Sequence, residues 1–186
     1  MKIVRDWTIG AIAFLVSATA AGEVVVINQA ISEQEVRAAQ DSWCNALLDI
    51  SKTYADDGHT AAKALTEKII DNAYAYQSGV VLFKPTLATN PQTFRTTRAG
   101  AVSYFVGGDP SFPDDDGFAI KDWKNCEVQN AAMFIFGDSA TSMGKVHFTD
   151  GDNNTTSVDK TWVFIKDDLE TLRIAAHHSS LEYQPE

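Results

Sequence analysis

The chain has 186 residues, 45% hydrophobic and 22% charged, which is the range of a single globular domain with a sizeable core. Its 25 acidic and 15 basic side chains give a formal net charge of −10. Such an acidic field repels phosphate backbones and anionic lipid, and the sequence has no basic stripe with interleaved aromatic residues, so nucleic acid is excluded as an expected partner.

The first residues have the pattern of a secretory signal peptide. Lys2 and Arg5 form a short positive region, residues 7–16 are apolar, and a run of small residues follows. The apolar stretch is too short to span a bilayer comfortably. We therefore expect a signal peptide over residues 1–21, and a single exported domain over residues 22–186 that is periplasmic or secreted and has no membrane partner after cleavage.

The mature chain opens with helical patterns. Ser32 and Glu35 form a capping box, and apolar side chains then recur every three or four residues until Gly58. The same period resumes at once and stops at Gly79. The expected helices cover residues 32–58 and 59–79, with a short third helix from Thr96 or Thr97 to Gly107.

Strand patterns make up most of the remainder. Apolar and polar residues alternate in segments separated by turn residues such as Gly137-Asp138 and Asp167-Asp168. Because short turns join antiparallel neighbours, the last four strands are expected to form a meander. The expected strands cover residues 80–83, 118–123, 126–136, 139–148, 157–165 and 171–181.

Helices followed by antiparallel strands indicate an α+β fold, in which a curved, mostly antiparallel sheet wraps its concave side around the N-terminal helices. This is the shape of a cone with a pocket. The order of elements resembles the cone-shaped fold shared by nuclear transport factor 2, ketosteroid isomerase and the association domain of calcium/calmodulin-dependent kinase. That superfamily has many functions, so the fold alone does not decide the activity.

The last predicted strand ends in two histidines and two serines. Because side chains alternate between the faces of a strand, His177 and Ser179 are expected to share one face. Ile174, Ala176 and His178 are expected on the other. One face can therefore pack while the other reacts.

Four local motifs stand in order along the chain. They read Val81-Leu-Phe-Lys-Pro-Thr86, Phe94-Arg-Thr-Thr97 with Ser103-Tyr-Phe-Val-Gly-Gly108, Gly117-Phe-Ala-Ile120, and His177-His-Ser-Ser-Leu181. Together they resemble the iota class of carbonic anhydrases, and the resemblance extends from about Trp43 to Tyr183. Each motif is weak by itself, but their joint order makes a chance similarity improbable.

The resemblance implies reversible hydration of carbon dioxide to bicarbonate in the cone pocket, without a metal and without a cofactor. Carried over residue by residue, the family's bicarbonate-binding hydroxyls fall on Thr86, Tyr104 and Ser179. Two positions depart from the family's pattern: Arg98 stands near the start of the third helix where an acidic residue is expected, and His147 stands where an aromatic residue is expected.

The attacking water has to lose a proton, and two chemistries could achieve this. Zinc lowers the pKa of bound water from about 15.7 to about 7, but His177 and His178 point to opposite faces and cannot both bind one ion without a bulge. A zinc site that pairs His177 with His147 stays an alternative. Without a metal, His177 is the expected general base, because imidazole titrates near neutral pH and this ring shares a face with Ser179.

Two cysteines, Cys44 and Cys126, have no metal-ligand spacing. Export would permit a disulfide between them. One cysteine, however, lies on a predicted helix and the other on a predicted strand, and these need not meet. We therefore expect two free, buried thiols.

Two further classes of function stay open. One is a non-catalytic module that binds a small apolar or anionic ligand in the same cone. The other is an isomerase or cyclase of the ketosteroid type, which needs a pocket carboxylate with a raised pKa, and no acidic residue stands out for this role. In each case we expect a homodimer, since one face of the last two strands carries apolar residues that no helix covers.

Overall fold

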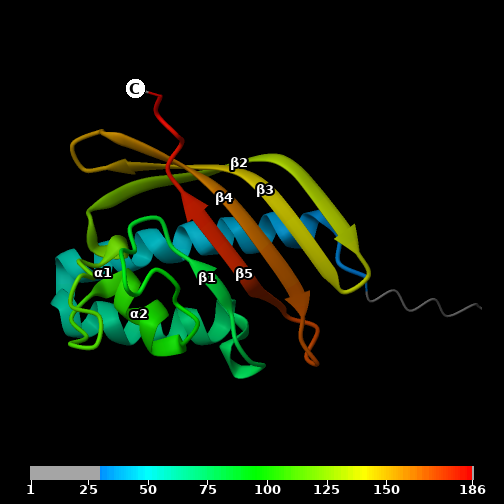
Figure 1. Cartoon of the computed structure of the whole chain (residues 1–186), viewed down its shortest axis with the longest axis horizontal. Helices are drawn as coiled ribbons and strands as arrows, with labels where there is room; N and C mark the ends of the chain where they lie inside the picture. Colours follow the sequence, from blue (N-terminus) through cyan, green and yellow to red (C-terminus); the bar gives the residue numbers. More distant parts are fainter. Residues whose placement is uncertain (1–29, 186) are drawn as a thin grey trace, which may run out of the picture.

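A long helix crosses the inner face of a curved sheet in the computed structural model of the chain, which describes residues 30–185 (Figure 1). Helix α1 spans Glu33–Ala73, and its N-terminus has the predicted capping box between Ser32 and Glu35. Gly58, at φ 81°, interrupts the helical backbone, so the two predicted helices are both present and meet at this glycine. The predicted signal peptide lies outside the described residues.

Three short elements and one further helix connect α1 to the large strands. The third helix, α2, spans Arg98–Val106 and is capped by Thr97, as predicted. The prediction of a strand over residues 118–123 was wrong: residues 118–120 form a short 3-10 helix, and the indole of Trp123, the first residue of β2, donates to the Phe118 carbonyl over 2.6 Å. The short elements are η1 (Ala75–Gln77), β1 (Leu82–Lys84) and η2 (Phe118–Ile120).

The sheet has the strand order β1-β5-β4-β3-β2. Its last four strands form the predicted antiparallel meander, and β1 joins the free edge of β5 in parallel. This edge strand places residues 82–84 beside residues 176–178 of β5 (Figure 1). The strands span β2 (Trp123–Phe136), β3 (Ser139–Asp150), β4 (Thr155–Lys166) and β5 (Leu172–Ser180).

Strand β5 carries one extra residue, Ala175, between the pairs that Ile174 and Ala176 form with β4. His177 and Ser179 are both buried and the side chain between them is exposed, so the prediction that they share a face is confirmed. The prediction that Ile174 lies on the opposite face was wrong. It is buried in the core, because regular alternation does not hold across a β-bulge.

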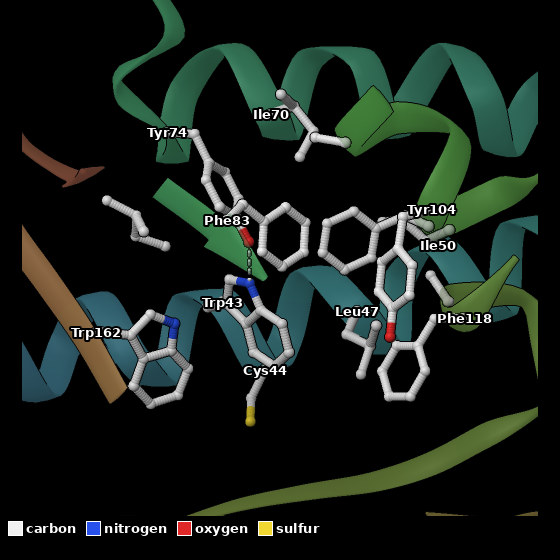
Figure 2. Packing of buried hydrophobic residues seen from close by; sticks show 14 of the residues in the cluster. Trp43, Cys44, Leu47, Ile50, Ile70, Tyr74, Phe83, Tyr104, Phe118 and Trp162 are labelled. Carbon is white, nitrogen blue, oxygen red and sulfur yellow. Dashed lines mark hydrogen bonds between the residues drawn. The ribbon is translucent and has the colours of Figure 1, made fainter. Parts of the chain in front are cut away.

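The core fills the space between the helices and the concave face of the sheet (Figure 2). Aromatic side chains dominate it, with Trp43 from α1 and Phe83 from β1 near its centre. None of the helices within residues 30–185 has an apolar stretch long enough to cross a membrane.

Cys44 of α1 and Cys126 of β2 form a disulfide, so the prediction of two free thiols was wrong. The two cysteines are 82 positions apart in the sequence, yet their Cα atoms lie 5.4 Å apart, within the usual range for a disulfide. They meet because Cys44 lies on the buried stripe of α1 and Cys126 packs against the core from the concave face of the sheet. The bridge therefore ties the helix to the sheet.

Candidate active site

Thr86 and Ser179 meet at the edge of the sheet. Strand β1 runs parallel to β5 with Phe83 opposite His177, and parallel strands advance together, so the residues that follow β1 reach the end of β5. The Thr86 hydroxyl donates to the Ser179 hydroxyl over 2.6 Å. Both residues were predicted for the site from their motifs, but the parallel pairing that brings them together was not predicted.

Tyr104 reaches the same place from α2. Its ring packs between Phe83 and Phe118, with ring centroids 5.6 and 5.7 Å away (Figure 2). Burial raises the pKa of the Tyr104 hydroxyl above its usual value of 10.0, while hydrogen bonds with the Leu87 backbone and with Thr86 act in the opposite direction. The hydroxyl therefore stays protonated at neutral pH and lies beside Thr86 as a donor.

His177 is only 2% exposed and sits among aromatic rings. Its ring stacks on Phe83 at a centroid distance of 4.6 Å and meets Trp43 edge to face at 5.5 Å. Nδ1 lies 2.9 Å from the Tyr74 hydroxyl, whereas Nε2 is buried without a hydrogen-bond partner among the described residues. Burial, aided by the charge of Lys160, lowers the pKa of His177 well below 6.5, so the imidazole is neutral at pH 7.

Lys160 belongs to the site, and the sequence analysis missed it. It stands opposite Ser179 in the pairing of β4 with β5, is only 4% exposed, and holds Nζ 4.1 Å from the centroid of the Trp43 ring. Burial lowers its pKa well below 10.5. Its neighbours on the inner face of β4 are Val158 and Trp162. A lysine in an otherwise apolar inward stripe was the signal that the sequence offered.

A small cavity joins these groups. Its volume is about 10 Å³, which is room for about one water molecule. Three hydroxyls and two side-chain nitrogens meet apolar walls there, so the cavity suits a molecule of a few atoms with oxygen acceptors. It is lined by Trp43, Phe83, Pro85, Thr86, Tyr104, Phe105, Phe118, Lys160, His177 and Ser179.

A larger groove of about 550 Å³ lies between α1 and the start of β5. Its walls are mostly apolar and include Ile69, Phe164 and Leu172, and none of the four predicted site residues lines it. Size alone would select this groove, but the groups that can bind and polarise a small substrate surround the smaller cavity.

The alternative of a zinc site on His177 and His147 is contradicted. His147 lies on the outer face of the sheet, where Nδ1 is 2.7 Å from the Ser157 hydroxyl and Nε2 is 3.4 Å from Gln129 Oε1. His177 lies on the inner face. Within residues 30–185, no group of three or more His, Cys, Asp or Glu side chains is placed to hold a metal ion.

A curved sheet that wraps around helices and encloses a small, hydroxyl-lined cavity defines a protein that can take a molecule of a few atoms inside the cone. The family model for metal-independent carbonic anhydrase matches residues 34–181, most of the chain. A metal-independent carbonic anhydrase from Nostoc sp. is 56% identical over 169 residues, which cover 91% of this chain and 82% of that protein. The chain therefore belongs to the metal-independent carbonic anhydrase family.

Solved structures agree with this assignment. The crystal structure of an iota-carbonic anhydrase from a cyanobacterium, complexed with bicarbonate, matches with a TM-score of 0.85 and 57% identity over 88% of this chain and 99% of that one. A putative calcium/calmodulin-dependent kinase II association domain from Xanthomonas campestris matches with a TM-score of 0.55 and 23% identity, over 83% of this chain and 91% of that one. The second match concerns the fold alone, and it agrees with the predicted cone-shaped α+β fold.

Proposed function

We propose that this chain catalyses the reversible hydration of carbon dioxide to bicarbonate, without a metal, in the cavity beside Ser179. One observation carries the proposal: a structure that is 57% identical to this chain holds bicarbonate, and this chain gathers hydroxyl donors from three separate elements around one small cavity. No aspartate or glutamate of the described residues lines that cavity, so the isomerase alternative lacks the carboxylate it needs.

The hydroxyls stabilise the charge that forms during hydration. As the water oxygen bonds to carbon, one C=O electron pair moves onto oxygen, and donors aimed at that oxygen lower the barrier. Thr86 donates a hydrogen bond to the Ser179 oxygen, so the Ser179 hydroxyl is free to donate a hydrogen bond to the substrate. Tyr104, protonated beside Thr86, is the other donor.

His177 contributes Nε2, because Nδ1 is already bonded to Tyr74. Nε2 can serve in two ways. It can accept a proton from water, as the sequence analysis expects, or it can donate a hydrogen bond to a substrate oxygen. The two roles require different tautomers of the neutral ring.

Stopped-flow measurement of carbon dioxide hydration tests the proposed function. Purified protein that has been dialysed against a strong chelator should hydrate carbon dioxide at the same rate as untreated protein, with its metal content measured in parallel. Activity that disappears on chelation and returns with zinc would contradict the metal-independent mechanism. Protein that binds bicarbonate but does not accelerate hydration would instead be the non-catalytic binding module.

Replacing Lys160 by methionine should weaken bicarbonate binding and stabilise the fold. Lys160 lines the cavity and can donate a hydrogen bond to the anionic product, and a hydrogen bond to a charged group contributes about 1.5–3 kcal/mol, or roughly 10- to 150-fold in affinity. We expect the KM for bicarbonate in the dehydration direction to rise by about this factor. An unchanged KM in a folded variant would remove Lys160 from the site.

The stability effect of Lys160→Met has a defined pH dependence. Folding lowers the pKa of Lys160 from its usual value of 10.5. Below pH 10.5 the unfolded chain therefore binds the lysine proton more tightly than the folded chain does. The free energy of unfolding of the wild type consequently rises as the pH increases towards 10.5. A methionine at this position does not titrate, so the variant lacks this loss of stability at neutral pH. The melting temperature of the variant should exceed that of the wild type at pH 7, by about 2–4 °C for each kcal/mol gained, and the difference should shrink near pH 10.5.

We also propose a homodimer that pairs the outer faces of two sheets. One cross-strand row on this face runs from Phe134 of β2 through Thr141, Val163 and Ala176 on the next three strands to Leu82 of β1, and only Thr141 in it is polar. Phe134 is 71% exposed and the nearby Phe136 is 76% exposed, a large apolar area for one subunit alone. A second copy would bury this row.

Light scattering at micromolar concentration should give twice the mass of one chain. The double variant Phe134→Lys/Phe136→Lys should shift the protein to the monomer, because it places two charges within the expected apolar contact. A wild-type protein that stays monomeric would reject the dimer.

Export from the cytoplasm is the remaining proposal, with cleavage after residue 21. It is supported by the disulfide between Cys44 and Cys126, since disulfides form and persist in oxidising compartments. The intact mass of the protein recovered from its native cells should correspond to a chain that begins at residue 22, and a mass that includes residues 1–21 would reject it.

A further inference from the structure

A chain of buried hydrogen bonds leads from α1 to the ring of His177. The indole Nε1 of Trp43 lies 3.0 Å from the Tyr74 hydroxyl, and that hydroxyl lies 2.9 Å from His177 Nδ1 (Figure 2 shows the first of these bonds). All three side chains belong to the buried part of the molecule, and Tyr74 is fully buried. Within the described residues, these groups must therefore satisfy one another rather than bond to solvent.

The direction of each bond follows from the chemistry of the groups. An indole nitrogen can only donate, so Trp43 donates to the oxygen of Tyr74. The Tyr74 hydroxyl carries one proton, and the nitrogen of His177 is the one acceptor among its two bonded partners in the described part of the chain. Tyr74 therefore donates to Nδ1. A neutral imidazole has one N–H, and with Nδ1 as the acceptor the proton lies on Nε2.

The other tautomer leaves more groups unsatisfied. With the proton on Nδ1, His177 would donate to Tyr74, and the Tyr74 proton would then lack an acceptor in the buried network. Nε2 would also remain unpaired, so two buried groups would go unsatisfied instead of one. A buried polar group without a partner costs about 1–3 kcal/mol, so the protonated Nε2 is the favoured state.

The position of the cavity shows which ring nitrogen of His177 a bound molecule could contact. His177 lines the cavity together with Thr86 and Ser179, but Tyr74 does not line it. The Nδ1 edge therefore faces the tyrosine in the protein interior, and Nε2 is the ring nitrogen left for a molecule in the cavity. A protonated Nε2 offers that molecule a hydrogen-bond donor, in addition to the hydroxyls.

We infer that Trp43 and Tyr74 are positioning residues that fix His177 as the Nε2–H tautomer, so that His177 donates a hydrogen bond to a substrate oxygen instead of acting as the general base. The inference rests on the proposed hydration activity and assigns one role within it. The ring moves no proton in this role, so the proton that the attacking water loses passes to solvent water or a buffer base. It stabilises the oxygen that becomes negative as bicarbonate forms, in the manner of an oxyanion hole.

Nitrogen-15 NMR of the imidazole rings tests the tautomer in the free protein, without reference to activity. The chain has four histidines, and the signal lost in His177→Gln identifies the ring of interest. We expect a protonated Nε2 and an unprotonated Nδ1 in the wild type. Tyr74→Phe should disturb this assignment. A matched control is Tyr76→Phe, which removes a neighbouring hydroxyl that donates to the Arg95 carbonyl and does not contact His177; it should leave the tautomer unchanged.

Two substitutions of His177 then separate a donor from a base. Glutamine can accept from Tyr74 through its carbonyl and donate through its amide, so it reproduces the inferred tautomer but cannot act as a base at neutral pH. His177→Gln should keep kcat/KM within about tenfold of wild type, whereas His177→Leu, which can do neither, should lose roughly 100- to 1000-fold. Thermal unfolding of both variants checks that they are folded.

Each outcome decides between the roles. A protonated Nδ1 in the wild type, or a Gln variant as inactive as the Leu variant, would overturn the inference and return His177 to the role of base. A wild-type protein with no hydration activity would instead reject the proposed function, while the NMR result would still report whether Trp43 and Tyr74 set the tautomer.

Discussion

Replacing Ser179 by alanine should lower kcat/KM for carbon dioxide hydration by roughly 100- to 1000-fold, the usual loss when one donor to a developing oxyanion is removed. Ser179 is buried in the cavity wall. Its oxygen accepts a hydrogen bond from Thr86, and its hydroxyl can donate a hydrogen bond to the substrate. The variant loses that donor. It also loses the oxygen that accepts the hydrogen bond of Thr86, so the Thr86 hydroxyl is left without this partner. Stopped-flow hydration measures the effect.

The neighbouring serine supplies the matched control. Ser180 lies on the other face of β5 and does not line the cavity, so Ser180→Ala should leave kcat/KM close to the wild-type value. Circular dichroism and light scattering show whether both variants keep their fold and assembly. If Ser180→Ala lost activity while Ser179→Ala kept it, the register of β5 described above would be wrong.

The disulfide should make the largest single contribution to stability. Cys44 and Cys126 are 82 positions apart, and closing a loop of this length stabilises a folded chain by roughly 4–5 kcal/mol in the chain-entropy model. The double variant Cys44→Ala/Cys126→Ala should therefore need much less urea to unfold. Its melting temperature should fall by roughly 10 °C or more.

Reduction of the wild type provides an independent comparison. A thiol reductant should bring the wild-type urea midpoint close to that of the double variant and should leave the variant itself unchanged. Activity measured well below the unfolding transition should survive in both, since neither cysteine lines the cavity. A double variant as stable as the oxidised wild type would show that the bridge adds nothing to the fold.

Most of the architecture could be predicted because it depends on local patterns. The capping box at Ser32, the break at Gly58 and the alternation of the meander strands are each determined by neighbouring residues, and each is present in the structure. The three hydroxyls of the site came from motifs in a known order. Their meeting around one cavity agrees with that prediction.

Apart from the strand wrongly predicted over residues 118–123, most of the errors concern contacts between distant segments. Periodicity could not show that the inner stripe of α1 meets β2 at Cys126, nor that β1 pairs in parallel with β5. The bulge at Ala175 has no signature in the alternation itself, so Ile174 was placed on the wrong face. Lys160 was missed because a charged residue in a strand is usually solvated, and only the three-dimensional pairing places it opposite Ser179.

The parallel pairing of β1 with β5 also determines when the site forms during folding. Thr86 and Ser179 are 93 positions apart, whereas the helix and each hairpin of the meander need only contacts between neighbouring segments. Distant pairings carry a larger entropic cost of loop closure and form slowly. During refolding, molecules that have already formed α1 and the hairpins of the meander therefore still lack the active site. They become catalytically active only when β1 pairs with β5.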